Sequence, residues 1–267
     1  MRPVITSPDN PLIRDLQKLQ TKAALRAERG VFVVEGPKQV AEAVAEGLVL
    51  RLLVITSAQR IKAAALLRLA AERGISVQEI SEAAFKKISD TQTPQGVLAV
   101  IERPKASEDI LAKGNLFLLL ECIQDPGNLG TIIRSAEGAG VDAVLLSEGC
   151  ADVYAPKTVR STMGSLYRVP ILTGVEPNKM IRYLQKRGVQ VCAAALTAES
   201  CSFTELSYRK PTAFVIGNEA KGLSEATINA ADQAVILPMA GKLESFNAGV
   251  AATLLAYFAG LEQGKIS

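Results

Sequence analysis

From residue 116 onward, short apolar runs alternate with helix-length segments, and this alternation constrains the fold more than any other feature of the chain. Strands that alternate with helices build a parallel sheet covered by helices on both faces. Ligands of such sheets bind outside the carboxyl ends of the strands, so the loops after strands are the first places to search for a function. The predicted strands lie at 116–122, 142–147, 168–173, 189–195, 213–217 and 234–237, and the predicted helices at 129–139, 156–164, 177–187, 224–231 and 247–262.

A smaller α/β region of about a hundred residues, a usual domain size, precedes this series. The polar stretch 104–114, which contains Pro104 and Gly114, is typical of a linker. We therefore predict a domain at 1–103, a linker at 104–114 and a second domain at 115–267. In the first domain, the sequence predicts strands at Val31–Val34, Leu50–Thr56, Ser76–Ile80 and Gly96–Ile101, and helices at Pro37–Glu46, Gln59–Arg73 and Glu82–Ile88.

The first domain also begins with a predicted basic helix over residues 9–29. Its basic residues stand four apart, a step that keeps side chains on one face of a helix. Residues 1–103 carry 15 Lys and Arg against 11 Asp and Glu, so the net positive charge of the chain lies here. This stripe either binds an anionic partner or is an ordinary solvated helix face. The stripe consists of Arg14, Lys18, Lys22 and Arg26, with Arg29 next.

Several classes of protein are excluded by what the chain lacks. It contains no histidine, which excludes Ser-His-Asp triads and His-ligated metals. The four cysteines form no C-x-x-C pair and are typical of reduced structural thiols in a cytosolic protein. The N-terminus has no apolar signal-peptide core. The longest mostly apolar run, Ala248–Ala259, is shorter than the ~18 residues of a membrane span. We expect a cytoplasmic protein with no metal and no membrane partner.

The first strand of the second domain is followed by DPGNLGTIIRSAEGAG (125–140). Asn128 is placed to cap the helix that follows the Pro-Gly turn. Arg134 projects from the first turns of that helix. The stretch matches neither the Walker A nor the Rossmann fingerprint. The alternative explanation for Asn128 is plain helix capping, and the alternative for Arg134 is a surface ion pair.

A second loop, AFVIGNEAKGLS (213–224), also follows a strand. Gly217 and Gly222 allow the backbone to approach a ligand closely. Glu219 lies between them, although a lone carboxylate in a turn is usually just exposed.

The third loop lies in VILPMAGKLESFNAGVAATLLAYFA (235–259). Ser245 or Asn247 is placed to cap a long apolar helix. The first turns of this helix are built from small residues, which allow another segment to pass close by.

Together the three loops resemble the ordered motifs of the SpoU (TrmH-type) RNA ribose methyltransferases of the SPOUT superfamily. N-x-G-x-x-x-R, from Asn128 to Arg134, is similar to the first motif of this family. IGNEAKGLS resembles the second motif, and LPMAGKLESFNAGVA the third. APKTVRSTMGSLYRVPI (155–171) and TPQGVLAV (93–100) also resemble the family, so the resemblance covers nearly the whole chain.

This resemblance implies an α/β fold with a C-terminal SPOUT domain, in which a parallel sheet ends in a deep trefoil knot. It also implies a smaller N-terminal α/β domain similar to the ribosomal-protein-like RNA-binding domain. True knots are almost absent from proteins, so the knot is expected from the resemblance alone. The family further implies a homodimer in which residues of one subunit complete the site of the other.

The implied activity is S-adenosylmethionine-dependent methylation of a ribose 2′-hydroxyl in RNA. Large-subunit (23S) ribosomal RNA is the favoured substrate, because the N-terminal domain resembles that of family members acting on ribosomal RNA. A tRNA 2′-O-methyltransferase and a non-catalytic RNA- or ribosome-binding protein are the alternatives. A Rossmann-type dehydrogenase is disfavoured because the chain lacks its glycine fingerprint.

The resemblance also assigns site residues. The guanidinium of Arg134 has no free lone pair. It is therefore expected to grip a phosphate, while Glu219, Ser245 or a phosphate oxygen accepts the proton. The alternative role for Glu219 is structural, anchoring backbone amides across the knot. The expected catalytic residues are Asn128, Arg134, Glu219, Ser245 and Asn247. The expected cofactor-binding residues are Leu196, Thr197, Gly217, Asn218, Gly222, Leu237, Met239, Ser245 and Phe246. The expected RNA-binding residues are Arg14, Lys18, Lys22, Arg26, Arg29, Lys157 and Arg160.

Overall fold

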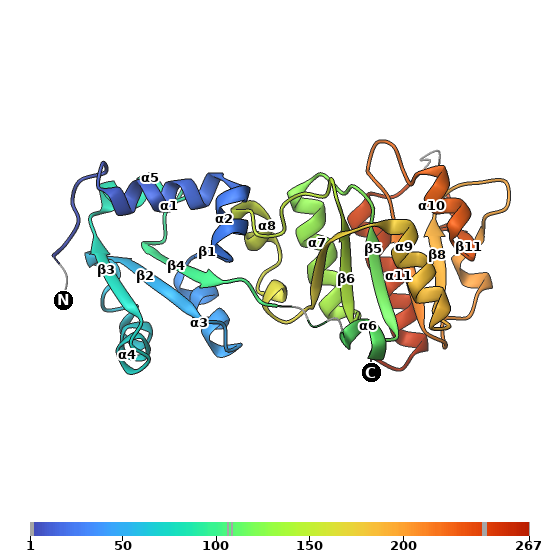
Figure 1. Ribbon diagram of the computed structural model, residues 1–267, viewed down its shortest axis with the longest axis horizontal. Helices are drawn as coiled ribbons and strands as arrows, with labels where there is room; N and C mark the ends of the chain where they lie inside the picture. Colours follow the sequence, from blue (N-terminus) through green and yellow to red (C-terminus); the bar gives the residue numbers. More distant parts are fainter. Residues whose placement is uncertain (1–2, 106, 108, 242–244, 267) are drawn as a thin grey trace. The chain divides into compact units, whose positions relative to one another are not determined.

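The computed structural model in Figure 1 describes residues 3–105, 107, 109–241 and 245–266. The chain forms two compact units. The first unit comprises Met1–Lys105 and Asp152–Tyr167, and the second unit comprises Ala106–Ala151 and Arg168–Ser267. The predicted domains were continuous in sequence. The structure differs because residues 152–167 leave the second half of the chain and pack with the first unit.

Within its described residues, the first unit has one mixed sheet in the order β1-β4-β2-β3. Strand β4 is antiparallel to β1 and β2, whereas β2 and β3 are parallel. All four strands predicted for this region are present. They are β1 (Val31–Glu35), β2 (Leu50–Thr56), β3 (Ser76–Ile80) and β4 (Val97–Glu102). The helices are α1 (Pro11–Thr21), α2 (Ala23–Arg29), α3 (Pro37–Ala45), α4 (Ala64–Glu72), α5 (Glu82–Ile88) and α8 (Pro156–Ser161), with short turns η1 (Ser57–Gln59) and η2 (Ser165–Tyr167).

The single helix predicted over residues 9–29 is wrong. Lys22 has an extended backbone (φ −111°, ψ 104°) and separates α1 from α2. The Arg26 guanidinium donates from Nη1 to the carbonyl oxygens of Leu19 (2.6 Å) and Gln20 (3.0 Å). A continuous helix would pair these carbonyls with its own backbone amides. The basic residues before and after Lys22 therefore do not share the face of one continuous helix.

Two other predicted helices are shorter than expected. The helix predicted over Gln59–Arg73 begins at Ala64, after the turn η1. The helix predicted over 156–164 ends at Ser161, because Met163 and Gly164 adopt positive φ angles (50° and 91°) that a right-handed helix excludes. Within the predicted linker 104–114, residues 106 and 108 lie outside the described residues.

The second unit contains a sheet in the order β7-β6-β5-β10-β8-β11-β9, and all of its described strand pairs are parallel. The α/β architecture with a parallel sheet is confirmed, and the knot stays a prediction. The two-residue edge strand β9 was not predicted. The strands are β5 (Leu116–Leu120), β6 (Ala143–Ser147), β7 (Ile171–Val175), β8 (Gln190–Ala194), β9 (Cys201–Ser202), β10 (Thr212–Ile216) and β11 (Gln233–Ile236). The helices are α6 (Asp109–Lys113), α7 (Pro126–Gly138), α9 (Pro177–Lys186), α10 (Glu225–Ala230) and α11 (Ala248–Glu262), with the short turn η3 (Phe203–Glu205).

Helices cover both faces of this parallel sheet (Figure 1). Helices α9 and α10 lie on one face, where Ile181 and Leu184 join a core with Phe117 and Val215. Helices α7 and α11 pack against each other on the other face. Strand β5 is buried throughout, as a continuous apolar run predicts for a strand covered on both sides. Because the strands are parallel, their carboxyl ends meet at one edge, which carries the loops singled out in the sequence.

Candidate active site

A cleft of about 860 Å³ lies at the carboxyl ends of β8, β10 and β11. Its volume falls within the range of roughly 300–1,000 Å³ that small-ligand pockets occupy. Leu196, Leu237 and Phe246 contribute apolar surface to its wall. All predicted cofactor-binding residues except Thr197 line this cleft; Thr197 hydrogen-bonds to Ser200 instead. The wall is formed mainly by residues 194–196, 216–222, 235–239 and 245–248.

The loop after β10 is folded tightly against itself. The backbone N–H of Asn218 donates to Gly222 O (3.1 Å), and the N–H of Gly222 donates back to Asn218 O (2.9 Å). A Cβ on Gly217 would lie 2.5 Å from the backbone nitrogen of Leu223 and 2.6 Å from Gly222 O. Real Cβ atoms never approach backbone so closely, so this turn requires glycine at position 217.

Asn218 fastens this loop to the end of β5. Its Oδ1 accepts hydrogen bonds from the backbone N–H groups of Ala220 and Lys221, both at 3.0 Å. Its Nδ2 donates to the carbonyl oxygen of Cys122 at 2.8 Å. Cys122 itself has a positive φ of 56°, which is uncommon for a residue with a side chain. The cleft wall is therefore held in one conformation by the strand next to it.

Three predicted catalytic residues form one chain of hydrogen bonds. The Nδ2 of Asn128 donates to Glu219 Oε1 at 2.9 Å. The Oδ1 of Asn128 accepts from Asn247 Nδ2 at 3.0 Å. The Oδ1 of Asn247 in turn accepts from the backbone amides of Gly249 (2.9 Å) and Val250 (3.4 Å), so Asn247, one of the two predicted candidates, caps α11. These hydrogen bonds join loops that lie far apart in the sequence.

The prediction that Asn128 caps the helix after the Pro-Gly turn is wrong. Helix α7 begins at Pro126, and Asp125 is its cap, with Oδ1 accepting from the backbone amide of Asn128 at 2.7 Å. Asn128 therefore lies inside the first turn. This position directs its side chain toward Glu219 and Asn247 instead of toward its own backbone.

The pKa of Glu219 lies below its ordinary value. Partial burial acts to raise this pKa, but the hydrogen bond from Asn128 and backbone N–H donors, including that of Gln124, outweigh it. The carboxylate is therefore ionised at neutral pH. A carboxylate with a lowered pKa is a weaker proton acceptor, so its environment favours an anchoring role over that of a base.

The other two predicted catalytic residues are placed differently. Ser245 is exposed and lines the cleft. Arg134 is exposed on α7 and does not line it. Its guanidinium makes no hydrogen bond or ion pair with any residue that the structure describes. The chain therefore brings together Asn128, Glu219, Ser245 and Asn247 and leaves Arg134 apart.

The predicted RNA-binding residues fall into three groups. Lys18, Lys22 and Lys157 are exposed. Arg26 is only 3% exposed and pairs with Asp152 at 2.6 Å, so its predicted contact with RNA is wrong; its burial makes it a structural group. The remaining arginines form surface pairs: Arg14 with Asp9 (3.5 Å), Arg29 with Asp15 (2.6 Å) and Arg160 with Asp90 (2.6 Å).

Sequence reasoning missed part of the cleft wall, notably Lys221 and Pro238. Both follow strand ends inside loops that had been singled out, so position after a strand was the signal that could have found them. Residues 242–244 of the third motif lie outside the described residues.

The described ranges contain neither a candidate metal site nor a candidate membrane-spanning helix. No three Cys, Asp and Glu side chains gather there in a group that could hold a metal ion. None of the helices in those ranges combines the length and the apolarity that crossing a membrane requires.

Comparison with known families gives two matches. Residues 115–257 match the SpoU rRNA Methylase family. Residues 10–99 match the MRM3-like substrate binding domain. The two matches correspond to the second and first halves of the chain.

Individual proteins resemble the chain over nearly its whole length. The 23S rRNA (guanosine(2553)-2′-O)-methyltransferase RlmP of Bacillus subtilis is 35% identical over 95% of this chain and 97% of its own. The 23S rRNA (uridine(2479)-2′-O)-methyltransferase of Streptomyces viridochromogenes is 30% identical over 93% of this chain and 88% of its own. Among solved structures, an AdoMet-bound rRNA methyltransferase from Sinorhizobium meliloti superimposes with a TM-score of 0.84 at 32% identity, covering 96% of this chain and 97% of that one.

Proposed function

The chain belongs to the SpoU rRNA methylase family, and on that premise we propose that it transfers a methyl group from S-adenosylmethionine to a ribose 2′-hydroxyl of 23S ribosomal RNA. The observation that carries the proposal is the meeting of three separate loops at one cleft, through the hydrogen bonds that join Glu219, Asn128 and Asn247. Relatives named as 23S rRNA methyltransferases support the substrate. A 23S rRNA substrate favours a cytoplasmic location.

The residues of the cleft fit S-adenosylmethionine in size and chemistry. Because Gly217 has no side chain, the loop folds tightly on its own backbone, and this loop lines the cleft. Leu196, Leu237 and Phe246 offer apolar surface suited to an adenine ring. When bound there, the donor would supply a methyl group on a sulfonium, from which a neutral thioether leaves readily. The remaining tasks, positioning and deprotonating the hydroxyl, fall to the protein.

Asn128 is equipped to orient the ribose. An asparagine amide has two N–H donors and two acceptor lone pairs. Its bonds to Glu219 and Asn247 use one donor and one lone pair, so one of each is left for a substrate. The same bonds fix the rotamer and the amide orientation, because only Nδ2 can face a carboxylate. Ser245, exposed in the wall, adds a hydroxyl that can hydrogen-bond to the sugar.

We further propose a homodimer in which Arg134 of one subunit completes the cleft of the other. Arg134 does not line the cleft of its own protomer, and a guanidinium suits bidentate binding of the phosphate next to the target ribose. Helix α11, which packs on α7, supports the dimer with an exposed apolar stripe. A second copy of the chain would cover this surface. The stripe consists of Val250 (42% exposed), Leu254 (42%), Tyr257 (47%) and Leu261 (47%), at helical spacing.

The experiment that tests the function uses the purified chain, isotope-labelled S-adenosylmethionine and unmodified 23S rRNA. We expect label at a single ribose 2′-oxygen, mapped by resistance to alkaline cleavage, and heat of binding with S-adenosylmethionine in calorimetry. Label on a base would contradict the proposal. Transfer to tRNA alone would favour the tRNA methyltransferase, and absence of binding heat would favour the non-catalytic RNA-binding protein.

A further inference from the structure

The connection between β6 and β7 carries α8 into the first unit and is held there firmly. Asp152, at its start, accepts from the buried Arg26 at 2.6 Å and 3.1 Å. The ring of Tyr154 packs against Phe32 at 5.2 Å and lies under the guanidinium of Arg103 at 4.3 Å. These contacts fix α8 on the first unit. Residues that the sequence places in the methyltransferase half thereby become part of the other unit's surface.

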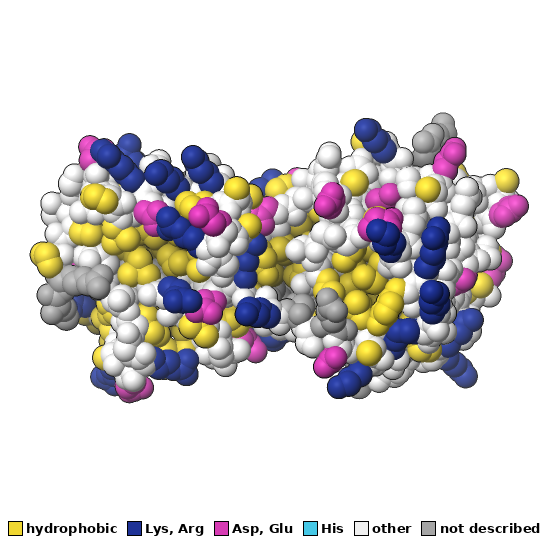
Figure 2. Space-filling view, in the orientation of Figure 1, with side chains coloured by type: hydrophobic (Ala, Val, Ile, Leu, Met, Phe, Trp, Pro, Cys, Tyr) yellow, Lys and Arg dark blue, Asp and Glu magenta, His cyan; other side chains and the backbone are white. Residues whose placement is uncertain are grey.

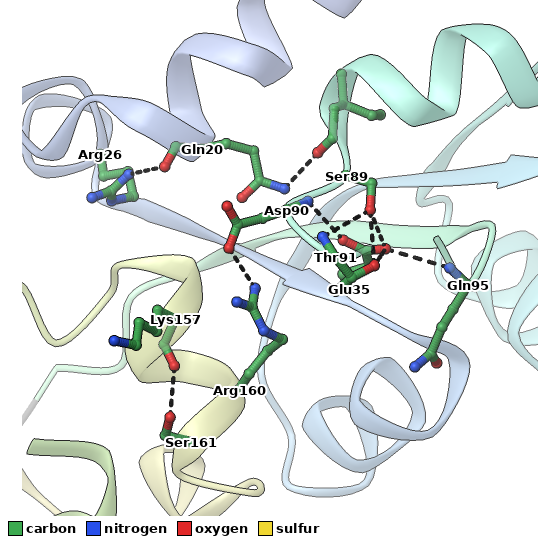
Figure 3. A network of polar contacts seen from close by, with 11 residues as sticks. Gln20, Arg26, Glu35, Ser89, Asp90, Thr91, Gln95, Lys157, Arg160 and Ser161 are labelled. Atoms are coloured by element: carbon green, nitrogen blue, oxygen red, sulfur yellow. Dashed lines mark hydrogen bonds and ion pairs between the residues drawn. The ribbon is translucent and has the colours of Figure 1, made fainter. Parts of the chain in front are cut away.

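Next to α8 lies a loop, residues 90–95, that we call the recognition loop. Figure 3 shows how one buried carboxylate, Glu35, holds it from inside. Glu35 is 9% exposed. Its Oε1 accepts from the hydroxyls of Ser89 (2.7 Å) and Thr91 (3.0 Å) and from the backbone N–H of Gln95 (3.4 Å). Its Oε2 accepts from the backbone N–H of Asp90 (3.3 Å). The loop is therefore organised before any partner binds.

The outer side of the recognition loop offers unused hydrogen-bonding groups. Gln92, Thr93 and Gln95 are exposed, and their side chains form no hydrogen bond with any part of the chain that the structure describes. Gly36 has a φ of +104°, and a Cβ there would lie 2.6 Å from Gln95 Oε1. The absence of a side chain at Gly36 thus makes room for the Gln95 amide. Amide side chains can both donate to and accept from the edges of nucleobases.

One arginine contacts this loop, and exposed lysines lie on neighbouring elements. Arg160 of α8 donates from Nη1 to Asp90 Oδ2 at 2.6 Å, and Lys157 is exposed one turn earlier. The Nε2 of Gln20 donates to Ile88 O at 2.6 Å and so joins the end of α1 to the end of α5, just before the loop. Figure 2 shows Lys and Arg side chains gathered over α1 and α5. The exposed lysines of these two elements and of the link after α1 are Lys18, Lys22, Lys86 and Lys87.

We propose that the first unit binds an unpaired stretch of RNA on this surface. Gln92 and Gln95 contact base edges, and Arg160 exchanges Asp90 for a backbone phosphate. Base edges are accessible in unpaired RNA but not in the deep groove of an RNA duplex, so the amides suit a loop or bulge. Asp90 orients the guanidinium before RNA arrives and competes with phosphate for it. The inference rests on the proposed function, because it takes RNA as the substrate.

The test measures binding of the full chain to a hairpin RNA with an unpaired loop and to a blunt duplex of the same stem, by fluorescence anisotropy over a range of salt concentrations. We expect Arg160→Ala to weaken hairpin binding about tenfold and to reduce the salt slope by about one. Asp90→Asn should strengthen binding. The matched control is Arg51→Ala, which removes an arginine that pairs with Glu102 on the surface of the same unit and should change nothing.

The double variant Gln92→Ala, Gln95→Ala tests base contact separately. It should reduce the preference for hairpin over duplex about tenfold and leave the salt slope unchanged. These side chains have no partners in the described structure, so we expect no change in melting temperature. A preference that survives this variant overturns the proposal. Equal effects of Arg160→Ala and Arg51→Ala also overturn it. If Arg160→Ala lowers the melting temperature, Arg160→Lys, which keeps the charge, replaces it and should recover most of the affinity.

Methylation kinetics separate this inference from the proposed function. Arg160→Ala should raise KM for RNA and leave kcat unchanged. If the unmodified chain binds hairpin RNA through these residues but transfers no methyl group, the proposed function fails and the inference stands. If the chain methylates RNA and Arg160→Ala leaves KM unchanged, the inference fails and the function stands.

Discussion

The two edges of the parallel sheet in the second unit each contain an acidic residue, and α11 reaches both. At the carboxyl edge, Asn247 caps the start of α11 and is linked through Asn128 to Glu219. At the amino edge, Lys265, just after α11, donates to Asp142 Oδ2 at 2.5 Å and to Gly140 O at 2.9 Å. The pKa values of Glu219 and Asp142 are both lowered.

The two carboxylates differ in whether the hydrogen-bonding groups around them are all paired or partly unpaired. One oxygen of Asp142 accepts from Lys265 and from the backbone amides of Asn115 (2.7 Å) and Leu116 (2.9 Å). Glu219 is exposed beside a cleft, and its partner Asn128 keeps an unused donor and acceptor. The contacts at the amino edge thus stabilise the fold, whereas the carboxyl edge keeps unpaired polar groups that a ligand can bind. We therefore expect changes at the carboxyl edge to reduce activity and changes at the amino edge to reduce stability.

The largest effect on activity is expected from Arg134→Ala. Loss of a guanidinium that fixes charge and position in the transition state should lower kcat by at least ~10²-fold. The melting temperature and the affinity for S-adenosylmethionine should stay near those of the unmodified chain, because Arg134 is exposed and has no partner among the described residues. Methyl-transfer kinetics and calorimetry check both halves of this prediction. Retained turnover would refute the role of Arg134.

Mixing two inactive variants tests whether Arg134 acts across subunits. Dimers of one Arg134→Ala chain and one Gly217→Ala chain contain one cleft with an intact Gly217. If the partner's arginine completes that cleft, mixing should recover up to about one quarter of the unmodified activity, because half of the randomly paired dimers are mixed and each has one working site. If each arginine serves its own cleft, no activity should return.

Gly217→Ala should reduce both activity and stability, because the added Cβ meets backbone and not a movable side chain. We expect a loss of about 1–3 kcal/mol in the free energy of unfolding and a loss of S-adenosylmethionine binding. Gly138→Ala is the control, since a Cβ there meets nothing within 4 Å and φ is not positive. Denaturant unfolding and calorimetry of the two variants provide the comparison. Equal free energies of unfolding for Gly217→Ala and Gly138→Ala would contradict the requirement for glycine at position 217.

Asn128→Ala should reduce kcat by about 10²-fold through misplacement of the ribose, with a smaller effect on stability. Asn128→Asp sharpens the test, because it puts a second carboxylate beside Glu219 and should raise the pKa of Glu219. The pH dependence of methyl transfer would then shift upward on its acid side. An unchanged profile in Asn128→Asp would show that the hydrogen bond to Glu219 does not matter for the reaction.

The sequence predicted the carboxyl edge much better than the amino edge. The loops that carry Asn128, Glu219 and Asn247 were singled out because they follow strands, whose carboxyl ends meet at one edge of a parallel sheet. The resemblance to the SpoU family then assigned these three residues to the site. The clamp between Asp142 and Lys265 had no such signal. These residues lie more than a hundred positions apart, and each is an ordinary charged residue in its own surroundings. Only the packing of α11 brings them together.

The basic stripe shows a different limit of sequence reasoning. Charge spacing predicted Arg26 on an exposed face, but its guanidinium satisfies the last carbonyls of α1 and pairs with Asp152 of a segment more than a hundred residues away. The membership of residues 152–167 in the first unit was equally hidden, because the strand and helix pattern places them in the second half. Local patterns predicted the elements, whereas tertiary contacts decided which charges remain on the surface.

The smallest effect is expected from Asp142→Asn, which should leave kcat unchanged and reduce the free energy of unfolding by about 1 kcal/mol at neutral pH. Burial acts to raise the pKa of Asp142, but the hydrogen bonds from Lys265 and from two backbone amides outweigh it and lower the pKa below 3.8. A lowered pKa means that the folded state favours the ionised form. The stabilisation is therefore fully present above the unfolded pKa and disappears as pH falls through the folded pKa. Unfolding of the variant and of the unmodified chain, measured from pH 7 down to below 3.8, should converge in acid. A constant difference over this range would show that Asp142 stabilises through its shape and not through its charge.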